Sequence, residues 1–389
     1  MQLPIASHAQ TALNTLNSQG FNAYIVGGAV RDLLRGTLPE DYDIATSARP
    51  ADVKRLFGKC IPTGEKHGTV TVIIDGRPIE ITTYRVDGPY FDARHPGSVS
   101  FCATIDDDVS RRDFTINAMA YDGETLLDRF GGQKDLDNGI IQTVGDPYTR
   151  FSEDALRILR AFRFAAVLNF QIAPPTLQAA IEKAPLLQNI SRERIYRELT
   201  KTLCGLRPQA LQPLLDCGGL QFLHIGTGAL ALLCETAKLP ELRYAAFCRL
   251  CGVAPDLLLA SLRAPKKVFL LSKAMYDFLS SPITAGKPAL KQQLTSLPQP
   301  LWMDVLHAYS IINRQDITEQ LQYAEEIIRN KEPYTIAMLQ INGNDLRALG
   351  ASGEETGKLL QKLLSDVVRD PAANQKEHLI ELAKKLLGS

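Results

Sequence analysis

Short segments with alternating or β-branched apolar residues are concentrated in the first third of the chain. They cover residues 23–27, 42–45, 69–74, 79–84 and 98–101, and each predicts a β-strand because alternate side chains share one face of a sheet. The sequence Asp75-Gly76-Arg77-Pro78 lies between the third and fourth segments and predicts the turn of a hairpin that joins them. Residues 1–20 carry Ala and Leu at helical spacing and predict a helix before the first strand.

The pattern changes after Pro147. Residues 152–205 follow helical spacing and are rich in Arg, Leu and Ala, and from residue 206 nearly the whole chain has a helical pattern. We therefore predict an α+β fold, in which a head with a mixed β-sheet and helices precedes parts that are entirely α-helical. The boundaries we expect are 1–147, 148–205, 206–300 and 301–389.

The amino-acid composition indicates only the approximate number of domains and the expected location of the protein. The 389 residues are 45% hydrophobic and 22% charged, which is typical of a globular protein with more than one domain. The formal net charge is zero, so a surface that binds nucleic acid would have to be local. Seven scattered cysteines favour a reducing, cytoplasmic location, and we expect no membrane span, which needs roughly 20 apolar residues.

Two carboxylates lie one residue apart shortly after a glycine pair at 27–28. Asp41 and Asp43 open the second predicted strand, where they would project to one face while the residue between them points away. Mg²⁺ binds few carboxylates together with phosphate oxygens, so we predict that Asp41 and Asp43 are metal ligands and catalytic residues of nucleotidyl transfer. Glu80 on the next hairpin could join them, although a solvent-facing Glu on an edge strand would give the same pattern.

Several residues near these acids are candidates for holding a nucleotide. Gly28 lets the backbone approach a triphosphate, and Arg31 lies one turn into the helix that follows. Arg112 could reach phosphate, while Asp113 and Asn117, four residues apart on a predicted helix, could hold ribose hydroxyls. A surface helix with Asp113 as its cap is the alternative.

The predicted helix at 152–164 places charged side chains on one face. At 100° per residue, Asp154, Arg157 and Arg160 fall within about 120°, and apolar residues lie opposite. Asp154 would accept a hydrogen bond from an exocyclic amine, and Arg157 would donate one to the adjacent ring nitrogen. Cytosine and adenine match this pattern, whereas guanine and uracil do not. Arg160 and Arg163 would lie further along, towards phosphates.

A simpler interpretation of the same charges stays open. Glu153 and Asp154 would complement the dipole of a helix in its first turn, and the arginines would form a solvated face. Four basic residues further along have the same two interpretations, a phosphate-binding surface for RNA or a solvated face. They are Arg192, Arg194, Arg197 and Lys201.

Taken together, these segments resemble the bacterial class II CCA-adding tRNA nucleotidyltransferases. The matching stretches are 27–32, 41–43, 67–72, 111–118, 128–132, 153–157 and 341–346. The resemblance implies a head, neck, body and tail, and the stepwise addition of C, C and A to the 3′ end of tRNA from CTP and ATP, with release of pyrophosphate and without a template. It assigns Asp41 and Asp43 to metal, and Asp154 and Arg157 to base selection.

The resemblance also implies functional roles for two segments of the chain. Residues 128–132 would be a hinge of the pocket, although Arg129 stands where such enzymes often have another residue, and residues 84–96 would form the loop required for A addition. An enzyme that adds only A in a divided CC/A system and a bacterial poly(A) polymerase are the alternatives. The full set of expected nucleotide-binding residues is Gly28, Arg31, Arg112, Asp113, Asn117, Glu153, Asp154, Arg157, Arg160 and Arg163.

Overall fold

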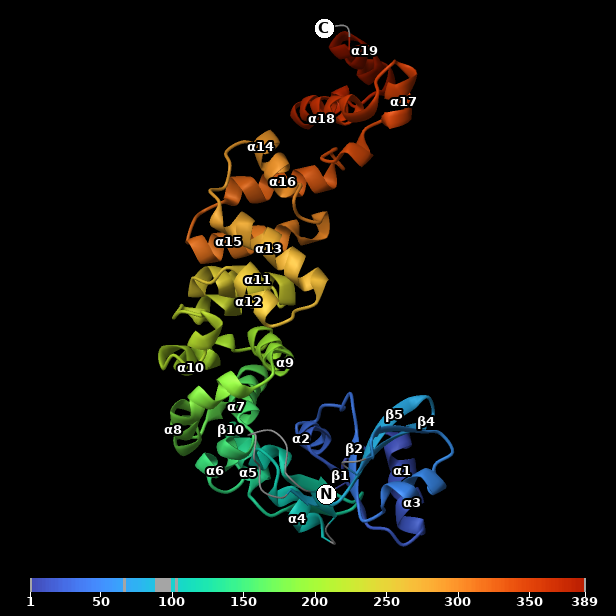
Figure 1. The fold of residues 1–389 in the computed structure, drawn as a ribbon, viewed down its shortest axis with the longest axis vertical. Coiled ribbons are helices and arrows are strands. Elements are labelled where there is room, and N and C mark those ends of the chain that lie inside the picture. The colour runs from blue at the N-terminus through green and yellow to red at the C-terminus, as the bar shows by residue number, and fades with distance from the viewer. Residues whose placement is uncertain (1, 66–67, 88–98, 102–103, 388–389) are drawn as a thin grey trace. The chain divides into compact units, whose positions relative to one another are not determined.

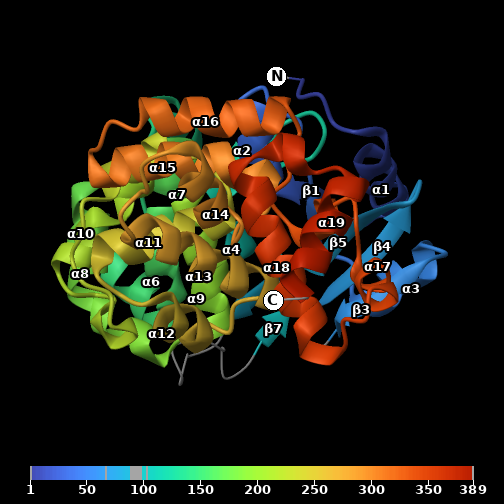
Figure 2. The ribbon, with the colours of Figure 1, turned by 90° about the horizontal axis from the view of Figure 1, so that it is seen from above.

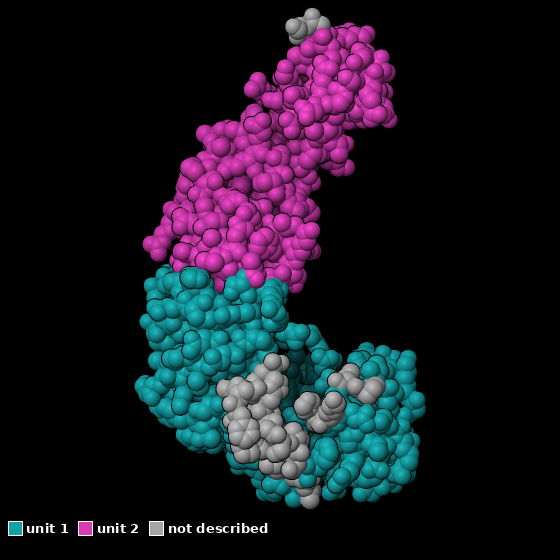
Figure 3. Space-filling view, viewed as in Figure 1, with its two compact units in different colours: residues 1–231, 261–263 teal, residues 232–260, 264–389 magenta. Residues whose placement is uncertain are grey.

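The computed structural model describes residues 2–65, 68–87, 99–101 and 104–387 (Figure 1). The chain divides into two compact units, coloured separately in Figure 3. Unit 1 contains Met1–Ala231 and Ser261–Arg263, and unit 2 contains Leu232–Ala260 and Ala264–Ser389. The finer division into four parts stays a prediction. Most of the loop expected at 84–96 lies outside the described residues.

Unit 1 begins with a mixed sheet of seven strands in the order β3-β4-β5-β2-β1-β8-β9. β2 and β5 pair in parallel, and the other neighbouring strands of this sheet pair antiparallel. The strands are β1 (Ala23–Val26), β2 (Asp43–Thr46), β3 (Cys60–Gly64), β4 (Thr69–Ile74), β5 (Arg77–Thr83), β8 (Met119–Tyr121) and β9 (Leu126–Asp128). A separate two-stranded sheet pairs β6 (Arg85–Asp87) with β7 (Val99–Phe101).

The strands predicted from alternation are confirmed, and so is the hairpin. Asp75 and Gly76 both have positive φ, 51° and 75°, as a two-residue turn between right-twisted strands requires. Three strands of the large sheet, β3, β8 and β9, were not predicted from the sequence. β8 and β9 have three residues each, and β8 is buried throughout, so neither shows the alternation that marks a strand with one solvated face.

Helices cover both faces of the large sheet. α1 (Ser7–Ser18) and α3 (Pro50–Leu56) pack beside β4 and β5 (Figure 2), and α1 buries Ala9, Leu13 and Leu16 there. α4 (Ile105–Ser110) packs against β2 and β8, and its Val109 shares an apolar cluster with Ala45 of β2. Asp43 lies two residues before Ala45 and therefore on the same face of β2, at the start of the strand.

The rest of unit 1 is mainly helical. Helix α7 (Leu156–Leu168) contributes the apolar face that the sequence predicted, because Ile158, Leu159 and Phe162 are almost fully buried. A short parallel pair joins β10 (Ile140–Ile141) to β11 (Gln171–Ile172). The helices are α2 (Gly28–Leu34), α5 (Gly132–Asn138), α6 (Pro147–Glu153), α7 (Leu156–Leu168), α8 (Pro174–Lys183), α9 (Arg192–Leu203) and α10 (Gln212–Asp216).

Unit 2 is built from helices, as predicted. Its chain forms α11 (Pro240–Cys251), α12 (Pro255–Ser261), α13 (Lys266–Ser280), α14 (Lys287–Leu294), α15 (Trp302–Asn313), α16 (Thr318–Arg329), α17 (Gly343–Ala348), α18 (Gly353–Arg369) and α19 (Lys376–Leu387). The last three helices share their own apolar cluster, centred on Leu346, Leu363 and Leu379. Within the described residues, no single helix has the length and apolar character of a membrane span, and α11 with α12 meets that test only as a pair bent by 120°.

A buried ionic cluster connects the last three helices to the rest of unit 2. The ammonium of Lys291 on α14 is almost inaccessible, and it donates to Glu332 at 2.6 Å and to the carbonyl of Val368 on α18 at 3.4 Å. Lys287 pairs with the other oxygen of Glu332. Burial alone would raise the pKa of Glu332, but the hydrogen bonds from Lys287 and Lys291 lower it overall. Glu332 is therefore the counter-ion that Lys287 and the buried Lys291 share.

We predict that Glu332→Gln destabilises the folded protein by about 3–5 kcal/mol, because it leaves the Lys291 ammonium buried without a counter-charge. The free energy of unfolding, measured by urea denaturation with far-UV circular dichroism, tests this. Glu354→Gln is the matched control, since the Glu354–Lys358 pair on α18 is 3.8 Å apart and exposed. Equal effects of the two substitutions would contradict the prediction.

Candidate active site

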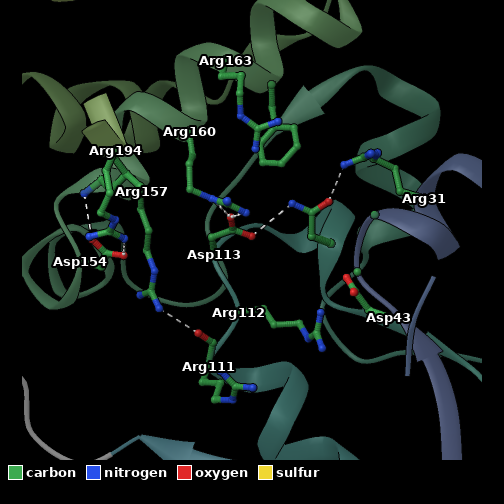
Figure 4. A pocket seen from close by; sticks show the side chains of 15 residues that line it. Arg31, Asp43, Arg111, Arg112, Asp113, Asp154, Arg157, Arg160, Arg163 and Arg194 are labelled. Carbon is green, nitrogen blue, oxygen red and sulfur yellow. Dashed lines mark hydrogen bonds and ion pairs between the residues drawn. The ribbon is translucent and has the colours of Figure 1, made fainter. Parts of the chain in front are cut away.

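A cavity of about 470 Å³ in unit 1 contains most of the predicted site residues (Figure 4). Seven arginines and three aspartates line it, so cationic side chains outnumber anionic ones. The lining residues are Gly27, Gly28, Arg31, Asp43, Arg111, Arg112, Asp113, Asn117, Asp154, Leu156, Arg157, Arg160, Arg163, Phe164 and Arg194. A partly enclosed site with surplus positive charge attracts a ligand that carries several negative charges.

The glycine turn at Gly27 and Gly28 forms one wall of the cavity. Gly27 joins β1 to α2 with φ of 71°, a conformation that favours glycine. A Cβ atom at Gly27 would lie 3.0 Å from Nη1 of Arg112 and 3.8 Å from Oδ2 of Asp43. The backbone therefore approaches both a cation and an anion of the cavity. Arg31 on α2 donates to Asn117 at 2.9 Å and also pairs with its neighbour Asp32.

Asp43 is surrounded by other charges. It lies opposite Glu80 in the parallel pairing of β2 with β5. The pKa of Asp43 is raised, first by the protein atoms packed around it and then by the charge of Glu80, while Arg112 lowers it and Asp41 raises it further. The carboxylate is nevertheless accessible to solvent within the cavity. Carboxylates that repel one another in this way favour a proton or a cation.

The strand geometry predicted for Asp41 is wrong, because β2 begins at Asp43 and Asp41 lies in a bend before it. Tyr42 points away from the acids as predicted, since it is buried and its hydroxyl accepts a hydrogen bond from the N–H of Ala6. Within the part of the chain that the structure describes, no three His, Cys, Asp or Glu side chains are placed to hold a metal by themselves. A cation at Asp43 would need oxygens from a bound ligand.

Asp113 and Asn117 are partners of other protein groups. The prediction that they lie on one helix is wrong, because Asp113 precedes a single 3₁₀ turn, Thr115–Asn117. One oxygen of Asp113 accepts hydrogen bonds from the N–H of Phe114 and from the amide of Asn117. The other oxygen accepts from Arg160, at 2.6–2.7 Å. A ribose hydroxyl would have to displace one of these donors.

The ion pair with Arg160 also fixes the charge of Asp113. Burial alone would raise the pKa of Asp113, but the charge of Arg160 and the hydrogen bonds from Asn117 and Arg160 lower it to about 2. A continuous chain of hydrogen bonds thus runs from Arg31 through Asn117 and Asp113 to Arg160 (Figure 4). It connects α2, beside the glycine turn, to α7.

The predicted helix at 152–164 is broken in two. α6 ends at Glu153, Asp154 has an extended backbone with φ of −139° and ψ of 103°, and α7 begins at Leu156. The carboxylate of Asp154 accepts the N–H of Leu156, so Asp154 caps α7. The prediction that Asp154 shares a helical face with Arg157 and Arg160 is therefore wrong, although all three line the same cavity.

Asp154 and Arg157 are both held by other groups of the protein. Asp154 pairs with Arg194 of α9 at 2.8 Å. Arg157 donates to Glu153 at 2.5 Å and, from its other terminal nitrogen, to the carbonyl of Arg111 at 3.0 Å. Glu153 itself does not line the cavity and acts on it through Arg157. Each base-reading candidate is thus oriented and keeps further hydrogen-bonding positions open.

The aromatic ring of Phe164 lies among three arginines. The guanidinium carbons of Arg31, Arg160 and Arg163 are 5.3, 5.5 and 3.8 Å from its centroid. Arg163 pairs with Glu198 of α9 at 2.5 Å, and burial lowers its pKa although Glu198 opposes that shift. The face of an aromatic ring attracts cations, so Phe164 helps to hold these arginines beside one another.

Sequence reasoning missed the roles of Phe164 and Arg194 in this cavity. The sequence pattern presents Arg194 only as a basic candidate for RNA binding, whereas the structure places it beside Asp154. Of the other residues in that run, Arg192 lies over the ring of Phe222 at 4.7 Å, while Arg197 and Lys201 are exposed.

The sequence does contain a signal for the break between α6 and α7. An aspartate two residues before an apolar run is typical of the start of a helix, and it would have located the break at Asp154.

Comparison with known proteins gives a consistent result. The family model described as "Poly A polymerase head domain" matches residues 23–142, and "Probable RNA and SrmB- binding site of polymerase A" matches residues 169–224. A curated CCA-adding enzyme from Enterococcus faecalis is 35% identical over 395 residues, which cover 97% of this chain and 95% of that protein.

Two solved structures illustrate the likeness of the fold. The CCA-adding enzyme of Bacillus stearothermophilus in complex with CTP has a TM-score of 0.82 and 32% identity, covering 98% of both chains. The Thermotoga maritima CCA-adding enzyme complexed with tRNA has a TM-score of 0.66 and 21% identity, covering 98% of this chain and 96% of that one, and supports the fold alone. These similarities confirm the predicted fold class and the resemblance found in the sequence, and this chain belongs to the family of the CCA-adding enzymes.

Proposed function

We propose that this chain adds C, C and A in turn to the 3′ end of tRNA, using CTP and ATP, releasing pyrophosphate and needing no nucleic-acid template. The observation that carries the proposal is the arginine-lined cavity, in which Asp43 lies opposite Asp154 and Arg157 in a chain that matches CCA-adding enzymes along almost its whole length. One ligand with a triphosphate at one end and a base at the other fits this arrangement of charges.

The triphosphate would lie along the glycine turn and the arginines. Gly27 and Gly28 keep that wall free of side chains, and Arg112 reaches it from the opposite side. Guanidinium groups bind phosphate oxygens through paired, charge-assisted hydrogen bonds. We assign Arg112, Arg160 and Arg163 to phosphate, and Arg31 to the same wall. Asp113 and Asn117 would act indirectly, by orienting Arg160 and Arg31.

Members of this family are metal-dependent, and we propose Mg²⁺ as the metal and Asp41 and Asp43 as its protein ligands. Two carboxylates with phosphate oxygens and water form a typical Mg²⁺ site, which agrees with the mutual repulsion around Asp43. Bound there, the ion would favour ionisation of the attacking hydroxyl and neutralise charge on the transferred phosphate. Glu80 lies opposite Asp43 and is a third candidate.

The base would be selected by Asp154 and Arg157. The carboxylate accepts from the exocyclic amine of cytosine or adenine, and Arg157 donates to the ring nitrogen beside it. Guanine and uracil would leave both protein groups mispaired, at about 1–3 kcal/mol for each. Arg194, Glu153 and the carbonyl of Arg111 hold this pair in position, so less orientation is lost when the base binds.

The tRNA would bind through phosphate contacts on helical surfaces outside the cavity, because helical RNA is recognised mainly by shape. Arg197 and Lys201 on α9 are exposed candidates for such contacts. We also propose a cytoplasmic location, in agreement with the six described cysteines, which are free thiols.

We predict that the purified protein with Mg²⁺ extends a tRNA that lacks its 3′ end by C, C and A and then stops. Product length on a sequencing gel, with single and mixed nucleotides, measures this. Long A tracts on unrelated RNA would favour a poly(A) polymerase. Activity restricted to tRNA that already ends in CC would favour an A-adding enzyme of a divided system.

We predict that Arg157→Ala weakens discrimination against UTP and GTP by roughly 10- to 100-fold, because a donor to the ring nitrogen is lost. The ratio of kcat/KM for CTP to that for UTP is the measurement. Arg55→Ala is the control, since Arg55 is exposed on α3 and pairs with Asp52. Unchanged selectivity in Arg157→Ala would contradict the assignment.

We predict that Asp43→Asn lowers kcat by at least roughly 100-fold, yet stabilises the metal-free protein at neutral pH. Because the folded-state pKa of Asp43 is raised, the charged carboxylate costs stability once the pH exceeds that value. Thermal melting in EDTA should therefore show a gain over wild type at pH 8, and this gain should disappear as the pH falls through the raised pKa of Asp43 towards the ordinary value of 3.8. Glu124→Gln, an exposed change in the turn between β8 and β9, should show no such gain. A loss of stability at pH 8 in Asp43→Asn would refute the charge argument.

A further inference from the structure

We propose that Asp108 is a positioning residue that aims Arg111 and Arg112 at the phosphates of the incoming nucleotide. The inference rests on the proposed function, because it takes the arginine wall of the cavity to be the phosphate site. Asp108 lies on α4, its side chain is 1% exposed, and it does not line the cavity itself. It therefore acts from behind the arginines and does not touch a nucleotide.

A single carboxylate holds both guanidinium groups. Oδ1 of Asp108 accepts from Nε and Nη2 of Arg111 at 3.1 and 2.7 Å, and Oδ2 accepts from Nη2 of Arg112 at 3.1 Å. α4 ends at Ser110, and the N–H of Arg112 still bonds to the carbonyl of Val109. The turn that follows the helix brings both side chains back over the same aspartate.

The charge of this cluster is suited to orienting cations. Burial alone would raise the pKa of Asp108, but the charges of Arg112 and Arg111 lower it overall, so the carboxylate stays ionised at neutral pH. Two guanidinium groups share one carboxylate, which leaves one positive charge in excess. A buried ion pair contributes little net stability but strongly restrains the geometry of its members.

The restrained arginines reach three other parts of the site. Nη1 of Arg112 lies 3.0 Å from the position of a Cβ on Gly27, and the Arg112 charge acts on Asp43. Nε of Arg112 is buried and has no hydrogen-bond partner among the described residues. The carbonyl of Arg111 accepts the hydrogen bond from Arg157. Asp108 thus orients a segment that contacts the glycine turn and the base-reading arginine.

An asparagine at 108 could not replace the aspartate. The amide has one acceptor oxygen and no charge, so it cannot bind both guanidinium groups, and its N–H₂ group would face one of them. The two arginines would then repel each other and leave the phosphate wall. The expected defect grows with the number of phosphates on the ligand, which a general loss of structure would not produce.

The test compares CTP, CDP and CMP binding by calorimetry in wild type, Asp108→Asn and Asp107→Asn. Asp107 is the exposed neighbour on α4 and serves as the matched control. We expect Asp108→Asn to weaken CTP binding about 10-fold or more and CMP binding less than about 3-fold, since charge-assisted hydrogen bonds to phosphate are lost. Equal losses for CTP and CMP, or no loss, would overturn the proposal.

Two further variants separate this inference from the proposed function. Arg112→Ala should show the same phosphate-dependent loss. If it does and Asp108→Asn does not, the role of Asp108 is refuted while the phosphate site stands. If neither shows the loss, the phosphate assignment itself fails, and with it this proposal. Should Asp108→Asn not fold, Asp108→Ser decides: it also removes the charge and one acceptor oxygen, in a smaller side chain, and a wild-type ratio of CTP to CMP affinity would overturn the proposal.

Discussion

The repulsion among seven arginines that line one cavity is the constraint on which the rest of unit 1 depends. Such a concentration of charge is tolerated only because carboxylates in the cavity wall and behind it pair with the arginines. Asp108 holds two of the arginines, Asp113 and Asp154 hold one each, and Glu153 and Glu198 hold two more. Arg31 pairs with Asp32, so seven arginines share six carboxylates, and the positive charge in excess is available to an anionic ligand.

These pairs come from distant parts of the sequence, so they also connect the elements that form the site. Asp113 and Arg160 are 47 residues apart, and Asp154 and Arg194 are 40 apart. The Asp113–Arg160 pair and the bond from Arg157 to the carbonyl of Arg111 attach α7 to the segment beside the β-sheet, and the Asp154–Arg194 pair attaches α9 to the residue between α6 and α7. This agrees with the finding that residues 1–231 form one compact unit, although the chain changes character near residue 147.

Around the acids of the central strands β2 and β5, negative charge is in excess instead. Asp43 faces Glu80 across the parallel strand pair, and Asp41 adds a further negative charge. Arg112 only partly compensates for them. Negative charge is thus in excess at the end of the cavity where Asp43 lies, and positive charge is in excess along the arginine wall beside it. A triphosphate with a divalent cation would relieve both conditions at once, which is the physical basis of the proposed chemistry.

The amino-acid sequence by itself determined the local elements and the residue types of the site. Alternation predicted β1, β2, β4 and β5, Asp75-Gly76 predicted their hairpin turn, and helical spacing predicted the buried face of α7. The role of Gly27 could be predicted from the neighbouring residues alone, because it follows from the position of this glycine between a strand and a helix. These features depend on contacts within a few residues, which periodicity and propensity report directly.

Only the tertiary structure decided which charges are partners. The sequence could not show that Asp113 binds Arg160, that Asp154 leaves the helix to cap α7, or that Arg194 belongs to the cavity. An arginine on a solvated face and an arginine in a binding site have the same spacing along a helix. The difference lies in which carboxylate approaches from another element, and that is set by how the chain packs, because electrostatic pairing depends on distance in space and not along the sequence.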